Sequence, residues 1–263
     1  MLKEEGTVSR FRLFASFKMY FGYAQAMSWI EDVAAQVEGW GDAARAAVEV
    51  AIFPSFTVLA PASSIVRDAG ISLGAQDVAP ELDGAQTGEV SAAEIAEIGC
   101  RYVELGHAER RERFGDTEAI IAKKVRAAVS VGLVPLLCVG EPELGGADNA
   151  ARVVTDQLRA ALVKVRDDRL TTPLVVAYEP VWAIGKRDPA SKEHVRVVIG
   201  ALRAAVSAEP TITDYAVIYG GSVGPESVAD LADVVDGVFL GRYAHDTQDF
   251  ARIAAAIIET TPS

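Results

Sequence analysis

Several features that mark other classes of protein are scarce or missing in this chain of 263 residues. Only two cysteines occur, Cys100 and Cys138, which argues against a disulfide framework and favours reduced, buried thiols. No apolar run is long enough to cross a membrane, and residues 1–5 place two acids where a signal peptide would be basic. These absences favour a cytoplasmic protein with no membrane partner.

Positive charge is also scarce. Lys and Arg number 25 against 37 Asp and Glu, which gives a formal net charge of −12. Such a surface argues against nucleic acid as a partner. A phosphorylated substrate would therefore need a local pocket of cations or backbone amides. Because 50% of the residues are hydrophobic, the chain has ample material for a large core.

Short apolar runs alternate with longer segments of helical periodicity along the whole chain. The runs predicted as strands are 12–17, 48–53, 72–76, 102–105, 134–139, 174–178, 216–219 and 237–240. The clearest predicted helices are 117–131, 151–165, 192–208 and 248–258. Eight strand–helix units in about 250 residues match an α/β fold of the (β/α)8 barrel type in number and size.

A doubly wound sheet is the rival fold. It would need a glycine-rich phosphate loop after the first strand, and Lys18-Met19-Tyr20-Phe21 is not such a loop. No linker or change of composition divides the chain. We therefore predict one barrel domain over residues 1–263, in which residues 1–9 form a flexible N-terminal extension.

Polar residues stand where several of the predicted strands end, among them Lys18, Gln76, His107 and Glu179. In a (β/α)8 barrel the carboxyl ends of all strands converge on one face, where active sites form. Residues far apart in the sequence should therefore become neighbours at this face.

Glu179 and His107 are the residues best suited to proton transfer. Glu179 ends an apolar strand beside the bulky Tyr178 and Trp182, and a partly dry setting of this kind raises the basicity of a carboxylate. His107 opens a charged helix, whose positive end favours neutral imidazole. Read singly, each could be a solvated strand end or a helix cap.

Lys18 and the late glycines suggest how an anion would be held. Lys18 could be an ordinary surface lysine, a Schiff-base lysine, or a cation that attracts a phosphate. The Schiff-base role is disfavoured, because such a lysine should lie buried in the middle of a strand, whereas Lys18 stands at a strand end. Gly220-Gly221 and Gly241 follow the last two strands, where backbone N–H groups can approach a phosphate. No His or Cys pair has metal-ligand spacing, so no metal site is predicted.

Taken in order, the motifs resemble those of the triosephosphate isomerase family along about residues 10–258. The matching blocks are Phe17-Lys18-Met19, Gly74-Ala75-Gln76-Asp77, Thr87-Gly88-Glu89-Val90-Ser91, Leu105-Gly106-His107, Glu109-Arg110-Arg111, Cys138-Val139-Gly140-Glu141, the run from Tyr178 to Gly185, the run from Tyr219 to Val223, and the run from Asp236 to Gly241.

The resemblance implies an isomerase that shifts a carbonyl along a short phosphosugar through an enediol(ate), with no cofactor. Glu179 matches the family's catalytic base and His107 its neutral electrophile. Lys18 matches the electrostatic element, and Glu109 the carboxylate beside it.

The resemblance also implies a set of phosphate contacts and a partner. Gly185 would belong to a lid over the phosphate, while Ser222 and Gly241 would supply amides. The segment from Gln76 to Glu89 resembles the family's interdigitating loop, which implies a homodimer with Thr87 near the partner's site.

The chain departs from the family pattern at several positions, and two of these departures, Ser16 and Arg242, point to an altered substrate. Ser16 stands where the family has Asn, and a hydroxyl cannot present an amide donor at the same reach. Residues 186–189 replace the usual end of the lid. Arg242 replaces the second glycine of the last Gly-Gly pair, where it would pair with the phosphate, fill substrate space or turn to solvent.

With its catalytic residues unchanged and its pocket altered, the chain resembles the triosephosphate isomerase paralogues that interconvert L-erythrulose 1-phosphate and D-erythrulose 4-phosphate in erythritol catabolism. We therefore expect a tetrulose phosphate as substrate. The alternatives are the glycolytic triose phosphates, a barrel that binds a phosphometabolite without turnover, and a Schiff-base aldolase. The joint presence of Glu179, His107 and Lys18 argues against mere binding, which needs no base.

Overall fold

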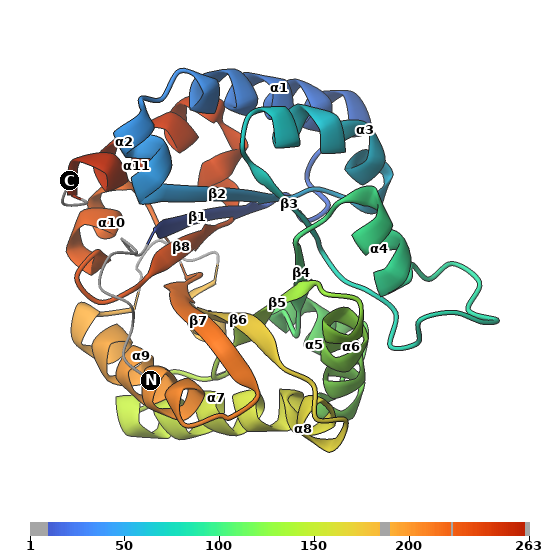
Figure 1. The fold of residues 1–263 in the computed structure, drawn as a ribbon. Coiled ribbons are helices and arrows are strands. Elements are labelled where there is room, and N and C mark those ends of the chain that lie inside the picture. Colours follow the sequence, from blue (N-terminus) through green and yellow to red (C-terminus); the bar gives the residue numbers. More distant parts are fainter. Residues whose placement is uncertain (1–9, 185–189, 222, 261–263) are drawn as a thin grey trace.

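Eight parallel strands close into a barrel in the order of the sequence (Figure 1). The computed structural model describes residues 10–184, 190–221 and 223–260, so the expected extension 1–9 lies outside the described residues. The strands are β1 (Phe11–Ser16), β2 (Val48–Phe53), β3 (Ser72–Ala75), β4 (Tyr102–Leu105), β5 (Val134–Val139), β6 (Thr172–Tyr178), β7 (Ile212–Tyr219) and β8 (Gly237–Leu240). The predicted (β/α)8 barrel is confirmed.

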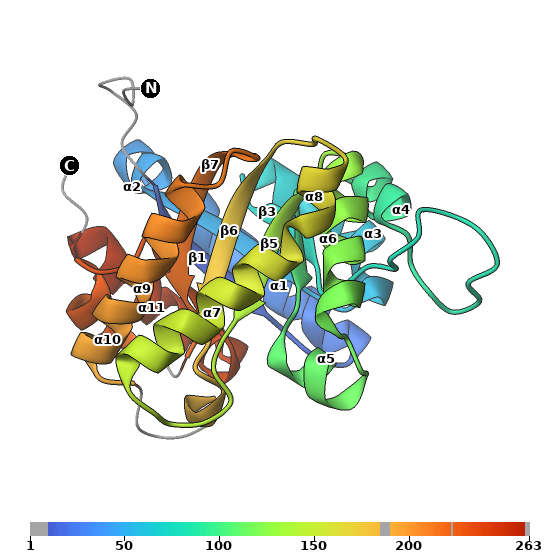
Figure 2. The same ribbon diagram turned by 90° about the horizontal axis from the view of Figure 1, so that it is seen from below.

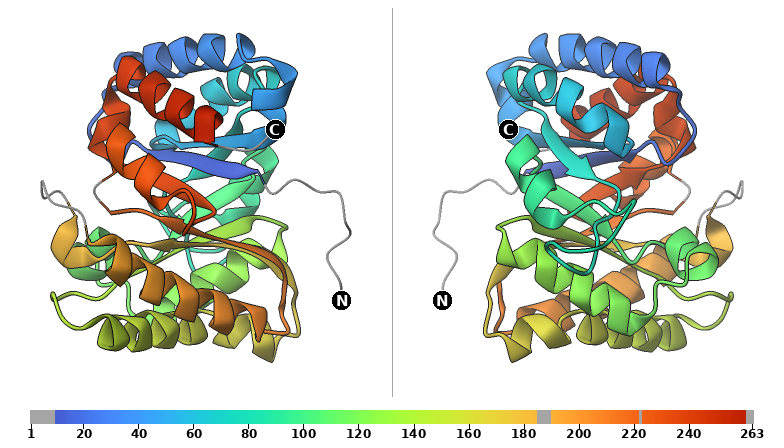
Figure 3. Two further views of the ribbon diagram at one scale, coloured as in Figure 1. Left: turned by 90° about the vertical axis from the view of Figure 1, so that its left-hand side faces the viewer. Right: turned by 90° about the vertical axis from the view of Figure 1, so that its right-hand side faces the viewer.

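Helices surround the strands on all sides, as the views in Figures 2 and 3 show. They are α1 (Tyr23–Glu38), α2 (Asp42–Ala47), α3 (Phe56–Asp68), α4 (Ala92–Ile98), α5 (Ala108–Arg113), α6 (Glu118–Ser130), α7 (Ala147–Ala161), α8 (Val163–Asp167), α9 (Lys192–Ser207), α10 (Pro225–Leu231) and α11 (Thr247–Thr260). Two 3₁₀ turns, η1 (Val181–Ala183) and η2 (Arg242–His245), follow β6 and β8.

The barrel has an apolar layer on each side of its wall. Inward side chains such as Phe14, Phe53 and Phe239 fill the interior, while a larger cluster packs the outer faces of the strands against the helices. Strands covered on both faces read as nearly continuous apolar runs, which is why the sequence pattern revealed them. β2, for example, is buried at all six positions.

The predicted boundaries were wrong mainly where polar residues extend an element. β7 begins at Ile212 rather than 216, because Thr213 and Asp214 are exposed and interrupt the apolar run. The helix expected over 151–165 is α7 followed by the separate short α8. α7 starts four residues early at a Gly146 N-cap with no side-chain hydrogen bond, so no capping residue signalled its start.

A long loop between β3 and α4 extends away from the barrel (Figure 2). Its base is closed by a hydrogen bond from the Ala79 N–H to the Val90 carbonyl, 2.8 Å long. Its tip, residues 83–89, is exposed. This is the segment that the sequence assigned to dimer contact. Among the described residues, no helix has both the length and the apolar character needed to cross a bilayer.

Candidate active site

A cavity of about 760 Å³ opens at the carboxyl ends of the strands, a size that suits a small metabolite. Six of the predicted site residues line it: Ser16, Lys18, Glu109, Glu179, Gly241 and Arg242. Two others, Gly185 and Ser222, lie outside the described residues, as does the segment 186–189. The residues scattered through the sequence are thus brought together at one mouth of the barrel.

Glu179 follows β6 directly and is held by its backbone, because its N–H donates to the Val139 carbonyl on β5. Its side chain is buried, and burial raises the pKa of its carboxyl to about 7, although the charge of Lys18 and a hydrogen bond from Cys138 act against the rise. A Cβ at Gly220 would lie 2.7 Å from the Glu179 Oε1. Gly220 therefore makes room for the carboxylate, a different role from the phosphate contact expected of it.

Tyr178 and Trp182 do not shield Glu179 from solvent, contrary to what the sequence had suggested. Tyr178 and Trp182 face the other side of the barrel wall, where both donate hydrogen bonds to Glu141 Oε1, at 3.0 and 2.6 Å. His194 joins this cluster, with its Nε2 2.9 Å from the Tyr178 hydroxyl. The interior of the barrel buries Glu179 instead, since neighbours in a strand point to opposite faces.

His107 is the N-cap residue of α5, and its tautomer follows from its contacts. Its Nδ1 accepts a hydrogen bond of 3.1 Å from the Glu109 N–H, so in the neutral ring Nε2 must hold the proton. Burial, with a further contribution from the charge of Lys18, lowers the pKa of His107 to about 3. The predicted neutral imidazole thus agrees with the structure, through desolvation more than through the helix.

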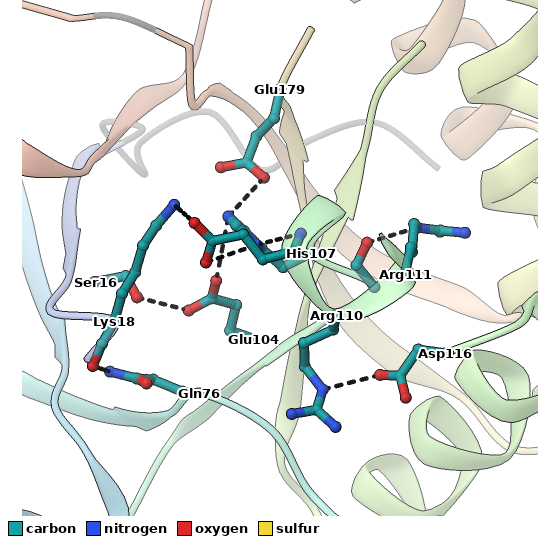
Figure 4. A network of polar contacts seen from close by, with 11 residues as sticks. Ser16, Lys18, Gln76, Glu104, His107, Arg110, Arg111, Asp116 and Glu179 are labelled. Atoms are coloured by element: carbon teal, nitrogen blue, oxygen red, sulfur yellow. Dashed lines mark hydrogen bonds and ion pairs between the residues drawn. The ribbon is translucent and has the colours of Figure 1, made fainter. Parts of the chain in front are cut away.

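His107 Nε2 and Glu179 Oε2 face each other at 3.5 Å (Figure 4). Both atoms are buried, and neither has a hydrogen-bond partner among the described residues. Orphaned buried polar atoms are rare because each costs the desolvation of a polar group. A donor and an acceptor left open beside one cavity are suited to bind and protonate a polar ligand.

Lys18 lies at the same mouth on a strained backbone, with φ of 48°. Its Nζ donates to Glu109 Oε1 at 3.1 Å. Burial alone would lower the pKa of Lys18, but the nearby carboxylates, Glu179 foremost, outweigh it and raise the pKa. The Gln76 amide donates to the carbonyls of Lys18 and Phe53, at 3.0 and 2.8 Å, and so fixes the loop that carries the lysine.

Sequence reasoning missed Glu104 and treated Cys138 as a core residue. Glu104 is buried on β4, where its Oε2 accepts a 2.9 Å hydrogen bond from the Ser16 hydroxyl and its Oε1 lies 4.0 Å from His107 Nε2. Because Tyr102 points into the barrel, the alternation of a strand also places Glu104 inward, a signal present in the sequence. The Cys138 thiol is buried and donates a hydrogen bond to the Glu179 carboxylate, and burial raises the pKa of the thiol.

Arg242 opens η2 at the rim of the cavity, where it is exposed. This turn packs against the loop after β1, because the rings of Tyr20 and His245 lie 4.8 Å apart. Burial, then the charges of Arg242 and Lys18, lower the pKa of His245. The two cations therefore place positive potential on the same side of the mouth. His245 thus joins the two loops.

The fold and this site define a barrel enzyme in which a carboxylate lines the cavity and a neutral imidazole lies 3.5 Å from that carboxylate. Residues 11–257 match the family model described as Triosephosphate isomerase. The chain belongs to the triosephosphate isomerase family, as predicted.

Individual relatives carry two different names. One from Pectobacterium atrosepticum, named L-erythrulose-1-phosphate isomerase, is 42% identical over 90% of this chain and 92% of its own. One from Azoarcus sp., named triosephosphate isomerase, is 43% identical over 81% of this chain and 88% of its own. Another of that name, from Chloroflexus aurantiacus, is 38% identical over 90% and 95%.

Among the described residues, no group of three or more His, Cys, Asp or Glu side chains is placed to hold a metal ion. The groups at the mouth are instead those of proton transfer: a carboxyl whose pKa is near neutrality and an imidazole that keeps one fixed proton.

Proposed function

We propose that the protein isomerises a tetrulose phosphate, interconverting L-erythrulose 1-phosphate and D-erythrulose 4-phosphate. The observation that carries the proposal is the open pair of His107 Nε2 and Glu179 Oε2, 3.5 Å apart and without partners among the described residues. A base and a fixed proton donor on one cavity suit the movement of a carbonyl between adjacent carbons.

The proposed reaction needs only proton transfers. Glu179 removes the hydrogen from C3 while the electrons of that bond form the C2–C3 double bond, and the His107 Nε2–H gives its proton to the carbonyl oxygen on C2. The result is an enediol. His107 then takes the proton of the C3 hydroxyl, Glu179 returns a proton to C2, and the carbonyl now stands on C3. Charge that develops on the oxygens is stabilised by Lys18.

Phosphate binding is assigned to the side of the mouth formed by the loops after β7 and β8. Gly221 and Gly241 line the cavity after β7 and β8, and Arg242 begins the turn that follows. Barrel enzymes commonly bind phosphate at these two loops. The guanidinium of Arg242 can pair with two phosphate oxygens, which agrees with the positive potential near His245. Gly185 and Ser222 remain proposed phosphate contacts.

Two observations favour the four-carbon substrate. The relative named L-erythrulose-1-phosphate isomerase spans nearly the whole chain at 42% identity. In addition, the Ser16 hydroxyl is engaged with a buried carboxyl instead of standing alone at the mouth. The runner-up is the interconversion of the triose phosphates, which is favoured by the names of the other relatives.

Turnover of both substrates by the wild-type protein tests the proposal. The tetrulose phosphate should give the larger kcat/KM. A preference of 100-fold or more for glyceraldehyde 3-phosphate, equivalent to about 3 kcal/mol in transition-state binding, contradicts it. Borohydride added with substrate should trap no adduct on Lys18, because the proposed reaction forms no Schiff base.

The proposed homodimer forms through the loop from Gln76 to Glu89. The exposed tip of this loop offers contact surface, and Gln76 bonds Lys18, which places the loop base beside Met19. The Met19 side chain is 95% exposed and, with the exposed Tyr20 beside it, offers apolar contact surface at this base. Thr87 is exposed at the tip, as its expected contact with the partner's site requires.

Sedimentation of Met19→Arg tests the dimer. The variant should sediment as a monomer at micromolar concentration, whereas wild type sediments as a dimer. Leu144→Arg is the matched control, because Leu144 is also highly exposed, at 71%, but lies on the loop between β5 and α7. A monomeric wild type contradicts the proposal.

A further inference from the structure

Glu104 is a buried acidic group behind Ser16, which lines the cavity, and the proton transfers above do not use it. Its carboxyl is 3% exposed. Figure 4 shows it between Ser16, which lines the cavity, and His107. Its Oε2 accepts a hydrogen bond from the Ser16 hydroxyl, and its Oε1 lies 4.0 Å from His107 Nε2. That separation is too long for a hydrogen bond.

A buried carboxyl with a single neutral hydrogen bond is costly to the fold. Burial, reinforced by the charge of Glu179, raises the pKa of Glu104 to about 8. Near neutral pH the group is therefore mostly a carboxylic acid, which has one O–H donor and spare acceptor capacity. A hydroxyl has the same pair of functions, so the two match each other.

The position of Glu104 in the barrel fits the far end of a phosphosugar. β4 stands four strands away from β8 in the closed order, and therefore across the barrel from the loop that carries Gly241 and Arg242. A substrate whose phosphate lies at that loop extends its other end toward β4. Its reacting carbons then lie against the neighbouring side chains of Glu179 and His107.

The two proposed substrates differ at that far end. L-erythrulose 1-phosphate has the skeleton of dihydroxyacetone phosphate with one hydroxymethyl group added to the reacting carbon that is remote from the phosphate. The triose has a hydrogen there. Any protein group that selects the tetrulose must therefore contact this added carbon or its hydroxyl.

We infer that Glu104, held in place by Ser16, hydrogen-bonds the terminal hydroxyl of the tetrulose phosphate and so determines the preference for four carbons. This inference rests on the proposed function. Discrimination follows because a buried polar group that loses its substrate partner is left unsatisfied, and sites built in this way reject the shorter analogue strongly.

The test compares kcat/KM for L-erythrulose 1-phosphate and for glyceraldehyde 3-phosphate in Glu104→Leu and Glu104→Gln. Leu has a similar volume without hydrogen-bonding atoms, so turnover of the tetrulose should fall by at least 100-fold and turnover of the triose by less than about 5-fold. Gln still donates and accepts, so it should retain tetrulose activity within about 10-fold. Ser16→Ala should give an intermediate loss on the tetrulose alone.

The outcomes separate this inference from the proposed function. Equal losses on both substrates would mean that Glu104 only positions His107, and unchanged tetrulose activity would mean that it contacts no substrate; either result overturns the inference. A wild type that prefers glyceraldehyde 3-phosphate overturns the proposed function and the inference together. Thermal unfolding of Glu104→Leu controls for folding, and no loss of stability is expected because a costly buried acid is removed.

Discussion

Two clusters of buried charged residues lie on neighbouring parts of this barrel, and they are satisfied to very different degrees. The mouth cluster consists of Lys18, Glu104, His107 and Glu179. The flank cluster consists of Asp77, Arg110, Asp116 and Lys124. Figure 4 shows members of both.

In the flank cluster the cations and carboxylates are closely matched. Lys124 Nζ donates three hydrogen bonds, to both oxygens of Asp77 and to Asp116, at 2.7 to 2.9 Å. Arg110 Nε adds contacts of 2.9 and 3.0 Å to the same two carboxylates. Complete pairing of this kind can offset the cost of burying charge.

In the mouth cluster the pairing is incomplete. Glu179 Oε2 and His107 Nε2 have no partner among the described residues, although both side chains are buried. Similar residue types at similar depth thus form a fully hydrogen-bonded cluster on the flank and a cluster with unpaired reactive atoms at the mouth. We conclude that unmet hydrogen bonds, more than burial or charge, distinguish the mouth cluster from the flank cluster.

Replacing Glu179 should have the largest effect on activity. Glu179→Gln removes the proposed base and should lower kcat by 10² to 10⁴-fold, measured with whichever phosphosugar wild type prefers. Stability should not fall. Because the pKa of the folded state is raised from 4.5 to about 7, the native protein binds the proton more tightly, and wild type loses stability as pH rises through this window. A variant with full activity would contradict the assignment.

Breaking the flank cluster should lower stability and leave activity nearly unchanged. Lys124→Met removes three hydrogen bonds and one charge from two buried carboxylates that keep only Arg110, and it should cost about 3 to 5 kcal/mol of unfolding free energy, with kcat of the folded fraction nearly unchanged. Chemical denaturation measures the loss. Lys123→Met is the matched control, because the Lys123 side chain is 56% exposed and its pair with Glu81 is loose. Equal stability of the two variants would show that the flank cluster is not structural.

Removing Lys18 should move the pH dependence of the mouth cluster. Activity should rise with pH through about 7 as Glu179 ionises, and the charge of Lys18 lowers the pKa of that carboxyl. In Lys18→Met the acid limb of kcat/KM should therefore shift to higher pH. Lys192→Met removes a surface charge that is paired with Asp233 and should leave the limb in place. A shift toward lower pH in Lys18→Met would refute this electrostatic role.

Glu109 should give the smallest effect. Its side chain is 37% exposed, so its pair with Lys18 is partly screened and worth at most about 1 kcal/mol. The N–H that sets the tautomer of His107 belongs to the backbone and persists in Glu109→Gln. We expect a loss of about tenfold or less in kcat/KM. A loss as large as that of Glu179→Gln would place Glu109 in the proton path.

The sequence predicted the barrel because its strands are buried on both faces and therefore appear as apolar runs. It also located Lys18, His107 and Glu179, because parallel strands of one barrel must end on one face. What it could not give were contacts that depend on three-dimensional pairing. The bond between Ser16 and Glu104 joins residues 88 positions apart. The unsatisfied hydrogen-bonding atoms of His107 and Glu179 become evident only when all neighbouring atoms have been placed.

Two interpretations from the sequence assigned the wrong neighbours. Tyr178 was expected to shield Glu179, but it lies on the outer face, where it bonds Glu141. Gly220 was expected to admit a phosphate, but its lack of a Cβ makes room for Glu179. In both cases the residue type was informative, whereas the neighbour that each residue faces could be known only from coordinates.

Turnover in D₂O tests the central claim most directly, because a proton that passes through Glu179 can exchange with solvent whereas a hydride shift cannot. Mass spectrometry of the product, and of substrate recovered at partial conversion, should show deuterium on a reacting carbon with wild type and almost none with Glu179→Gln. Complete conversion by the wild-type protein with no deuterium in the product would contradict transfer of the carbon-bound proton through Glu179.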